Sequence, residues 1–124
     1  MNLNRPKHLN LLTIRLPLPG IVSILHRISG FGLFLLIPIL LWMLDGSLRS
    51  VESFNQIRQF LVHPIARLLV LGTVWAVLHH FFAGLRFLAL DVHWGGELAT
   101  TRLVSKLVLL ASLSLTILAG VWLW

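Results

Sequence analysis

The chain has 124 residues, of which 57% are hydrophobic and only 11% are charged, and its mean hydropathy is +0.91. This composition excludes a water-soluble globule, because too few polar side chains are present to cover its surface. The lack of cysteine excludes disulfides, thiolate-held iron-sulfur clusters and covalently attached c-type haem. Neither a Walker loop nor a G-x-G-x-x-G motif occurs, so the chain has no nucleotide-binding or flavin-binding motif of its own.

Three long stretches carry no charged residue: Ile28–Leu44, Leu68–Leu85 and Leu107–Trp124. Each approaches the roughly 20 residues that an α-helix needs to cross about 30 Å of hydrocarbon. The stretches lack the two-residue alternation of barrel strands, and in lipid a backbone must satisfy its own hydrogen bonds, so helices are expected. We therefore predict an all-α membrane anchor with three transmembrane helices.

In chain order, the prediction is a single membrane-anchor domain over 1–124, with a surface segment at 1–20 and helices at about 21–45, 65–90 and 104–124. The segment Pro17–Gly20 breaks helices, so the residues before it are expected to run along the cytoplasmic surface. No A-x-A-type cleavage site follows the first apolar run, which is therefore expected to be retained. Between the first two spans, residues 47–60 are expected to include a short amphipathic helix, and Pro64 suits the start of the second span.

Basic residues are distributed unevenly around the expected spans. Those beside the first span and beside the connection of the second to the third are Arg5, Lys7, Arg15, Arg27, Arg86, Arg102 and Lys106. The positive-inside rule then predicts a cytoplasmic N-terminus and a periplasmic C-terminus. Trp42, Trp122 and Trp124 would lie near the outer interface, where indole rings are enriched. The net charge of +6 is thus explained by membrane topology, and no nucleic-acid partner is expected.

One face of the first span is polar at its cytoplasmic end. At 100° per residue, Ser23, His26, Arg27 and Gly30 fall within a sector of about 100°. Arg27 and His26 suit a haem propionate or a quinone carbonyl, because a guanidinium donates several hydrogen bonds and neutralises negative charge. The alternative is that Arg27 is an interfacial anchor that reaches the lipid headgroups, with its neighbours incidental.

The second span contains the pair His79-His80 in an otherwise apolar stretch, where a polar side chain needs a partner or a function. His80 lies six residues before Arg86, which places it about 9 Å deeper in the membrane. Gly84 is one turn further on the same face and leaves room for a flat ligand, a geometry that favours a haem site. The alternatives are close helix packing for Gly84 and an interhelical hydrogen bond for His80. His79 is rotated from His80 by about 100°, and either an interhelical hydrogen bond or a polar supporting role is expected.

Two adjacent histidines cannot bind one iron from opposite faces. If the iron has two axial imidazoles, the second comes from His26 or from a partner chain, because His8, His63 and His93 lie outside the apolar spans. We favour the partner.

The polar residues of the first and second spans form two motifs, S-I-x-H-R-x-[ST]-G at 23–30 and H-x-x-x-G-x-R-x-x-x-x-D at 80–91. Together with Arg5-Pro6 and Leu12–Arg15, they resemble the cytochrome b556 membrane-anchor subunits of bacterial succinate dehydrogenase, respiratory complex II. The resemblance covers nearly the whole chain.

The resemblance implies a complex with a flavoprotein, an iron-sulfur protein and a smaller anchor in the bacterial inner membrane. Electrons from succinate would reach ubiquinone, linking the tricarboxylic acid cycle to the respiratory chain, although this chain alone would not oxidise succinate. One haem b would lie between the two anchors, with His80 as an axial ligand to iron and the smaller anchor supplying the other. Ser23 and Arg27 match the quinone-site serine and arginine, while His26 and Arg27 match residues near the haem propionates.

The chain departs from the family at Phe87, where relatives often have histidine, so no role is transferred there. Asp91 matches an acidic residue whose role is open between proton uptake and pairing with Arg86 or Arg102. The alternative functions are the b-type anchor of another respiratory complex, such as fumarate reductase or formate dehydrogenase, and a small transporter with buried histidines. Transporters often have inverted repeats or helices broken at the midplane. Here Pro38 is only a weak candidate for a break and no repeat is apparent, which disfavours the transporter.

Overall fold

The computed structural model describes residues 14–124 as four helices in a single unit. They are α1 (Leu18–Arg49), α2 (Val51–Val62), α3 (Pro64–Asp91) and α4 (Leu98–Leu123). Of these, α1, α3 and α4 are long and apolar enough to cross a membrane. The expectation of an all-helical fold with three helices able to span a membrane is therefore confirmed for residues 14–124.

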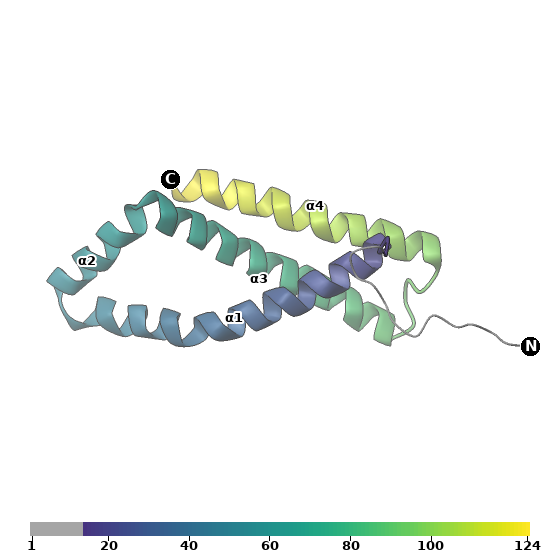
Figure 1. Ribbon diagram of the computed structural model, residues 1–124, viewed down its shortest axis with the longest axis horizontal. Coiled ribbons are helices and arrows are strands. Elements are labelled where there is room, and N and C mark those ends of the chain that lie inside the picture. Colours follow the sequence, from purple (N-terminus) through teal and green to yellow (C-terminus); the bar gives the residue numbers. More distant parts are fainter. Residues whose placement is uncertain (1–13) are drawn as a thin grey trace, which may run out of the picture.

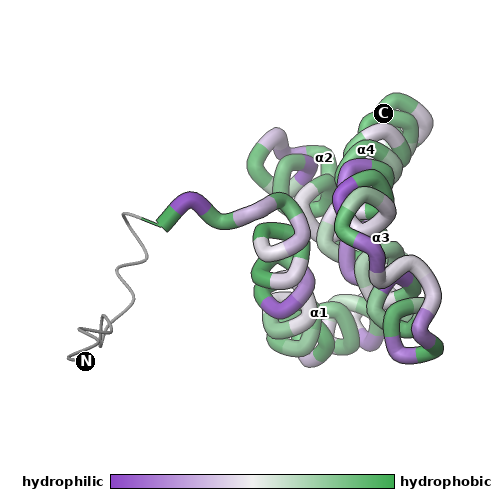
Figure 2. Tube along the Cα trace, turned by 90° about the vertical axis from the view of Figure 1, so that its right-hand side faces the viewer, coloured by the Kyte–Doolittle hydropathy of each residue, from purple (hydrophilic) through white to green (hydrophobic). Residues whose placement is uncertain are grey.

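The three long helices are not packed equally. Helix α3 contacts both α1 and α4, lying beside α4 along its length, whereas α1 crosses α3 near one end and diverges toward the other (Figure 1). Helix α2 joins the diverging ends of α1 and α3. The end-on view in Figure 2 shows α1 to one side of the α3 and α4 pair. The crossing of α1 and α3 is thus the place where residues far apart in sequence meet.

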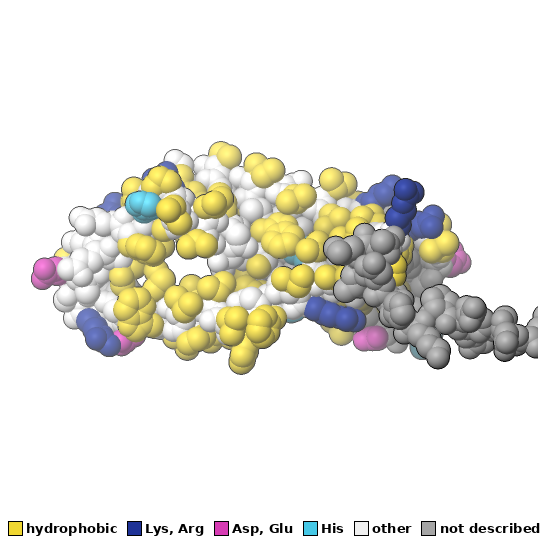
Figure 3. Space-filling model, in the orientation of Figure 1, with side chains coloured by type: hydrophobic (Ala, Val, Ile, Leu, Met, Phe, Trp, Pro, Cys, Tyr) yellow, Lys and Arg dark blue, Asp and Glu magenta, His cyan; other side chains and the backbone are white. Residues whose placement is uncertain are grey.

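The helix ends at each side of the unit agree with three antiparallel spans. The start of α1, the end of α3 and the start of α4 share one end, and α2 and the C-terminus share the other (Figure 1). Lys and Arg side chains gather toward the two ends, while apolar side chains cover much of the face between them (Figure 3). Arg5, Lys7 and His8, and most of the expected surface segment 1–20, lie outside the described residues.

The helices extend beyond the apolar stretches from which they were predicted. Helix α1 begins at Leu18, with Pro17 as its N-cap residue and Pro19 in its first turn, where proline lacks only an N–H that would be unpaired anyway. It continues through Pro38 to Arg49, so its 32 residues cover about 48 Å, more than the hydrocarbon thickness. Backbone hydrogen bonding does not depend on side-chain hydropathy, which is why α4 likewise starts earlier than expected, at Leu98.

Local sequence explains how α2 begins and how α3 ends. Ser50 and Ser53 form a capping box at the start of α2, the short helix expected between the first two spans. After α3, the N–H of Trp94 donates to the carbonyl of Ala89 and that of His93 to Leu90, which is a Schellman ending. His93 takes the left-handed conformation this ending requires, with φ of 61°.

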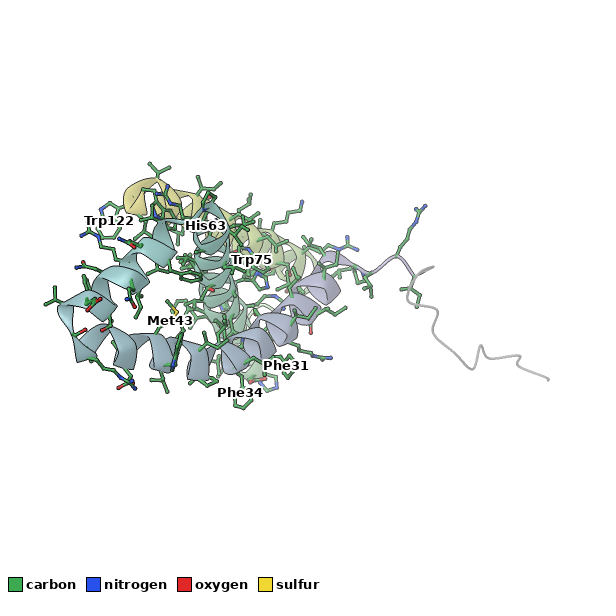
Figure 4. All side chains as sticks on the ribbon, turned by 60° about the vertical axis from the view of Figure 1, so that its left-hand side comes forward. Phe31, Phe34, Met43, His63, Trp75 and Trp122 are labelled. Carbon is green, nitrogen blue, oxygen red and sulfur yellow. The ribbon has the colours of Figure 1, made fainter. Side chains whose placement is uncertain are left out.

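Few side chains are buried among residues 14–124, and most of those are small. They are Val22, Ser29, Ala66, His79, Ala83, Arg86, Ser105, Val108 and Ser112. Lipid tails are as apolar as leucine, so membrane helices associate through close packing of small residues rather than by burying large apolar ones. Phe31 and Phe34, each 66% exposed, project from the outer side of α1 (Figure 4). The unit therefore presents an apolar exterior to lipid or to other subunits.

Candidate functional site

Two histidines meet where α1 crosses α3. The imidazole rings of His26 and His80 are stacked, with centroids 4.2 Å apart and an interplanar angle of 6°. Both side chains are half-buried, in contrast to the fully buried histidine next to His80 in sequence. The site therefore lies at an accessible edge of the helix crossing.

Each histidine packs over a glycine of the other helix. A Cβ atom added to Gly30 would lie 2.7 Å from Cε1 and 3.1 Å from Nδ1 of His80. A Cβ atom added to Gly84 would lie 3.6 Å from Nε2 of His26. Each glycine follows a histidine by four residues in its own helix, so the spacing H-x-x-x-G occurs at both sides of the crossing. The room over Gly84, expected to admit a flat ligand, is next to the His26 ring in this structure.

The His80 ring is oriented by hydrogen bonding to α1. Its Nδ1 atom is 3.1 Å from the backbone carbonyl oxygen of His26 and 3.5 Å from the hydroxyl oxygen of Ser29. A carbonyl oxygen can only accept, so Nδ1 carries the proton in this contact. The neutral ring then has its lone pair on Nε2, and within residues 14–124 neither contact uses that atom.

This contact is the interhelical hydrogen bond given as the alternative for His80, and the same geometry also fits a histidine that ligates a metal. Metal-binding imidazoles almost always donate their other ring N–H to a carboxylate, carbonyl or water, which fixes the tautomer and the ring plane. Among the residues the structure describes, no three His, Cys, Asp or Glu side chains lie close enough to bind a metal together. The geometry of His80 therefore suits a single nitrogen ligand, such as one to a haem iron.

Aromatic and cationic groups extend the site along α3. The Phe87 ring lies 5.2 Å from the His26 ring, tilted by 57°, and the Arg86 guanidinium carbon lies 5.2 Å from the centre of Phe87. Phe87 thus packs against His26. The apolar Phe87 ring covers part of the His26 imidazole and limits the access of water to it.

Ser23 and Arg27 lie on the same end of α1 as His26. Ser23 is half-buried, whereas Arg27 is exposed and lies further around the helix from α3. The predicted polar face is therefore divided: His26 and Gly30 turn toward α3, and the Arg27 guanidinium remains available to a ligand or to lipid headgroups.

His79 is directed into the interior of the unit. Its side chain is fully buried and its ring stacks on Trp75, with centroids 5.1 Å apart. Figure 4 shows Trp75 among the helices rather than on the exterior. Neither ring nitrogen of His79 has a hydrogen-bond partner within the described part of the chain. The two adjacent histidines thus occupy different environments, as expected from their 100° separation on a helix.

Other residues singled out from the sequence lie away from the crossing. His63 is the N-cap residue of α3, and its Nδ1 accepts from the N–H of Ile65 at 3.3 Å. Over residues 14–124 the one ion pair joins Asp45 to Arg49, so Asp91 pairs with neither Arg86 nor Arg102. At the opposite end of the molecule, the Arg67 guanidinium carbon lies 5.5 Å from the centre of the Trp124 ring, so the start of α3 and the end of α4 are in contact there.

Ser29 is a site residue that the sequence did not single out. It is 4% exposed, and its hydroxyl donates to the His26 carbonyl oxygen at 2.9 Å. A usable signal was present, because Ser29 and Ala83 are the small residues that precede the glycine in each H-x-x-x-G segment. Small residues at matching positions of two spans indicate a close helix crossing.

We expect the Gly84→Ala variant to keep both the fold and the histidine pair. The new methyl group would lie 3.6 Å from Nε2 of His26, within the ordinary van der Waals range of about 3.5–4.0 Å. Gly84→Leu should instead displace the His26 ring, because its larger side chain exceeds the available room. Thermal denaturation of the purified complex and its absorption spectrum would separate the two variants, and equal disruption by alanine would contradict this geometry.

Comparisons with known proteins agree on one group. The model of a family described as succinate dehydrogenase/fumarate reductase transmembrane subunit matches residues 1–119. The succinate dehydrogenase cytochrome b556 subunit of Coxiella burnetii is 39% identical over 100% of both chains. That of Paracoccus denitrificans is 31% identical over 93% of this chain and 88% of its own. The cytochrome b560 subunit of Reclinomonas americana is 31% identical over 98% of this chain and 88% of its own.

Proposed function

The chain belongs to the family of succinate dehydrogenase/fumarate reductase transmembrane subunits, as a multi-pass cytochrome b subunit of the bacterial inner membrane, and from this premise we propose its part in the complex. It binds one haem b jointly with a smaller anchor subunit and forms part of the site where ubiquinone is reduced with electrons from succinate. The observation that carries the proposal is the His80 ring, whose protonated Nδ1 faces the His26 carbonyl and whose Nε2 is left for iron.

His80 would hold the haem iron through Nε2, and His26 and Arg27 would bind the haem propionates. A bound haem b supplies a one-electron carrier inside the membrane, with a potential that depends on its axial ligands and their hydrogen bonds. Arg27 is suited to a propionate because its guanidinium neutralises the carboxylate and donates to both oxygens. The parallel His26 ring restricts rotation of the His80 imidazole, so the ligand is held in one plane before iron binds.

Ser23 and Arg27 bind the ubiquinone headgroup. They stand four residues apart on α1, so their side chains reach a common region at the end of the helix. Their hydrogen bonds to a quinone oxygen stabilise the negative charge that develops when electrons arrive.

The remaining elements of the site come from other subunits: a flavoprotein, an iron-sulfur protein and the smaller anchor. The His26 ring is stacked on the His80 ring and so lies on the same side of it, which supports a second axial ligand from a partner. The crowding of basic residues beside the start of α1 and the connection of α3 to α4 supports a cytoplasmic location for that end, with the C-terminus in the periplasm. On this assignment the quinone site lies near the cytoplasmic face, close to the soluble subunits.

Haem counting in the purified complex tests the proposal. We expect one b-type haem per copy of this chain and its reduction when succinate is added. Two haems per complex would favour another kind of respiratory anchor, because the additional axial ligands exceed those available at this crossing. A preparation of the intact complex without a Soret band would favour a transporter-like role for the buried histidines.

A further inference from the structure

We propose that Ser29 and Gly30 are positioning residues for the His80 imidazole. Gly30 leaves the room that the ring occupies against α1, and the Ser29 hydroxyl controls how strongly the His26 carbonyl holds the proton on Nδ1. The inference rests on the proposed function, because it concerns the ring assigned to the haem iron. Both residues act through His80, and neither is assigned a contact with haem or quinone.

Gly30 is required by its distance from His80, not by its backbone conformation. A methyl group at this position would lie 2.7 Å from Cε1 and 3.1 Å from Nδ1, closer than carbon and nitrogen atoms pack. The neighbouring group is a rigid imidazole rather than the end of a flexible chain. Any side chain at position 30 therefore shifts the ring and lengthens the 3.1 Å contact between Nδ1 and the His26 oxygen.

Ser29 acts on the same carbonyl oxygen, and its hydroxyl oxygen lies 3.5 Å from Nδ1 of His80. Its hydroxyl donates to the His26 oxygen at 2.9 Å while Nδ1 of His80 approaches that oxygen at 3.1 Å. Inside α1 this oxygen also accepts the helical N–H of Gly30, so the Ser29 hydroxyl and Nδ1 of His80 share its remaining acceptor capacity. The serine proton withdraws electron density from the oxygen, so the oxygen attracts the Nδ1 proton less strongly. Nε2 is then a weaker electron donor, which favours the reduced iron.

The chain contains a matched control for each residue. Ser112 is likewise buried, and its hydroxyl donates to the carbonyl of Leu109, again three residues back, at 3.0 Å. That bond involves no histidine. Gly32 lies in the same helix as Gly30, and an added Cβ atom there would meet nothing within 4 Å. Effects specific to the His80 ring should therefore appear at positions 29 and 30 and not at 112 or 32.

The test uses the intact complex carrying Ser29→Ala, Ser29→Thr, Gly30→Ala, Ser112→Ala or Gly32→Ala. The readouts are haem per complex, the haem midpoint potential and the electron paramagnetic resonance g-values of the oxidised haem, which respond to the imidazole plane. We expect Ser29→Ala to retain haem with a lower midpoint potential and shifted g-values. Ser29→Thr should restore both, because a threonine hydroxyl in a helix can bond to a carbonyl one turn back. Gly30→Ala should lose haem affinity about 10-fold or more, and the two controls should match wild type.

Wild-type potential and g-values in Ser29→Ala would overturn the proposal, as would an equal shift in Ser112→Ala. The Ser29 variants decide the matter even where Gly30→Ala complexes do not assemble. His80→Ala, measured in parallel, separates this inference from the proposed function. Unchanged haem in His80→Ala refutes the ligand assignment itself, whereas haem loss in His80→Ala together with unaltered Ser29 and Gly30 variants refutes the positioning role alone.

Discussion

The complex carrying His80→Ala is expected to lose its b-type haem absorption. Alanine removes the Nε2 lone pair that the structure leaves available when Nδ1 faces the His26 carbonyl. A single ligand from a partner would hold the haem weakly. Removing a group that only hydrogen-bonds to a metal ligand typically costs about 10- to 100-fold in affinity, and removing the ligand itself should cost at least as much. Reduced-minus-oxidised difference spectra of purified complex, normalised to protein, measure this directly.

The control for this experiment is a histidine outside the helix crossing. His93 lies beyond α3 in the left-handed conformation, which asparagine tolerates well, so His93→Asn should keep the wild-type spectrum. Subunit composition shows whether each complex has assembled. An assembled His80→Ala complex with an unaltered Soret band would mean that His80 is not the ligand.

The Arg27→Leu complex is expected to oxidise succinate normally but to reduce quinone poorly. Succinate oxidation with an artificial soluble acceptor bypasses the membrane site and should persist. Quinone reduction loses charge-assisted hydrogen bonds, each worth about 1.5–3 kcal/mol, which corresponds to a decrease of roughly 10- to 100-fold. The two assays are run on the same preparation, so that their ratio does not depend on yield.

Arg58 and a conservative variant supply the comparison for Arg27. Arg58 is an exposed arginine on α2, at the other end of the unit, so Arg58→Leu should leave the ratio unchanged. Arg27→Lys keeps the charge but loses the planar donor pair, and should recover only part of the activity. Equal losses in both assays for Arg27→Leu would indicate failed assembly, and no loss in either would remove Arg27 from the quinone site.

The sequence predicted the membrane spans well and their ends less well. Uncharged stretches locate the parts of a helix that lie in hydrocarbon, since charges are costly there. They do not locate helix ends, because a helix continues into water for as long as its backbone bonds and capping residues allow. This explains why α1 runs to Arg49 and α4 begins at Leu98, several residues outside the expected limits.

Within the candidate site, local spacing identified single residues and missed their pairing. His80 and Gly84 were linked because four residues make one helical turn. The stacking of His80 on His26 and its approach to Gly30 join positions about fifty residues apart. No periodicity within one helix contains that information, and Ser29 accordingly appeared only as one letter of a motif.

By itself, the sequence determined that this protein crosses the membrane as helices and that polar groups stand at one end of two spans. These properties follow from the side chains of each segment and from the cost of placing them in lipid. Only the tertiary structure decided which of those groups meet, which nitrogen of His80 faces α1, and that His79 is turned inward. Helix crossings in lipid depend on the close fit of small residues from both partners, a property that neither helix has alone.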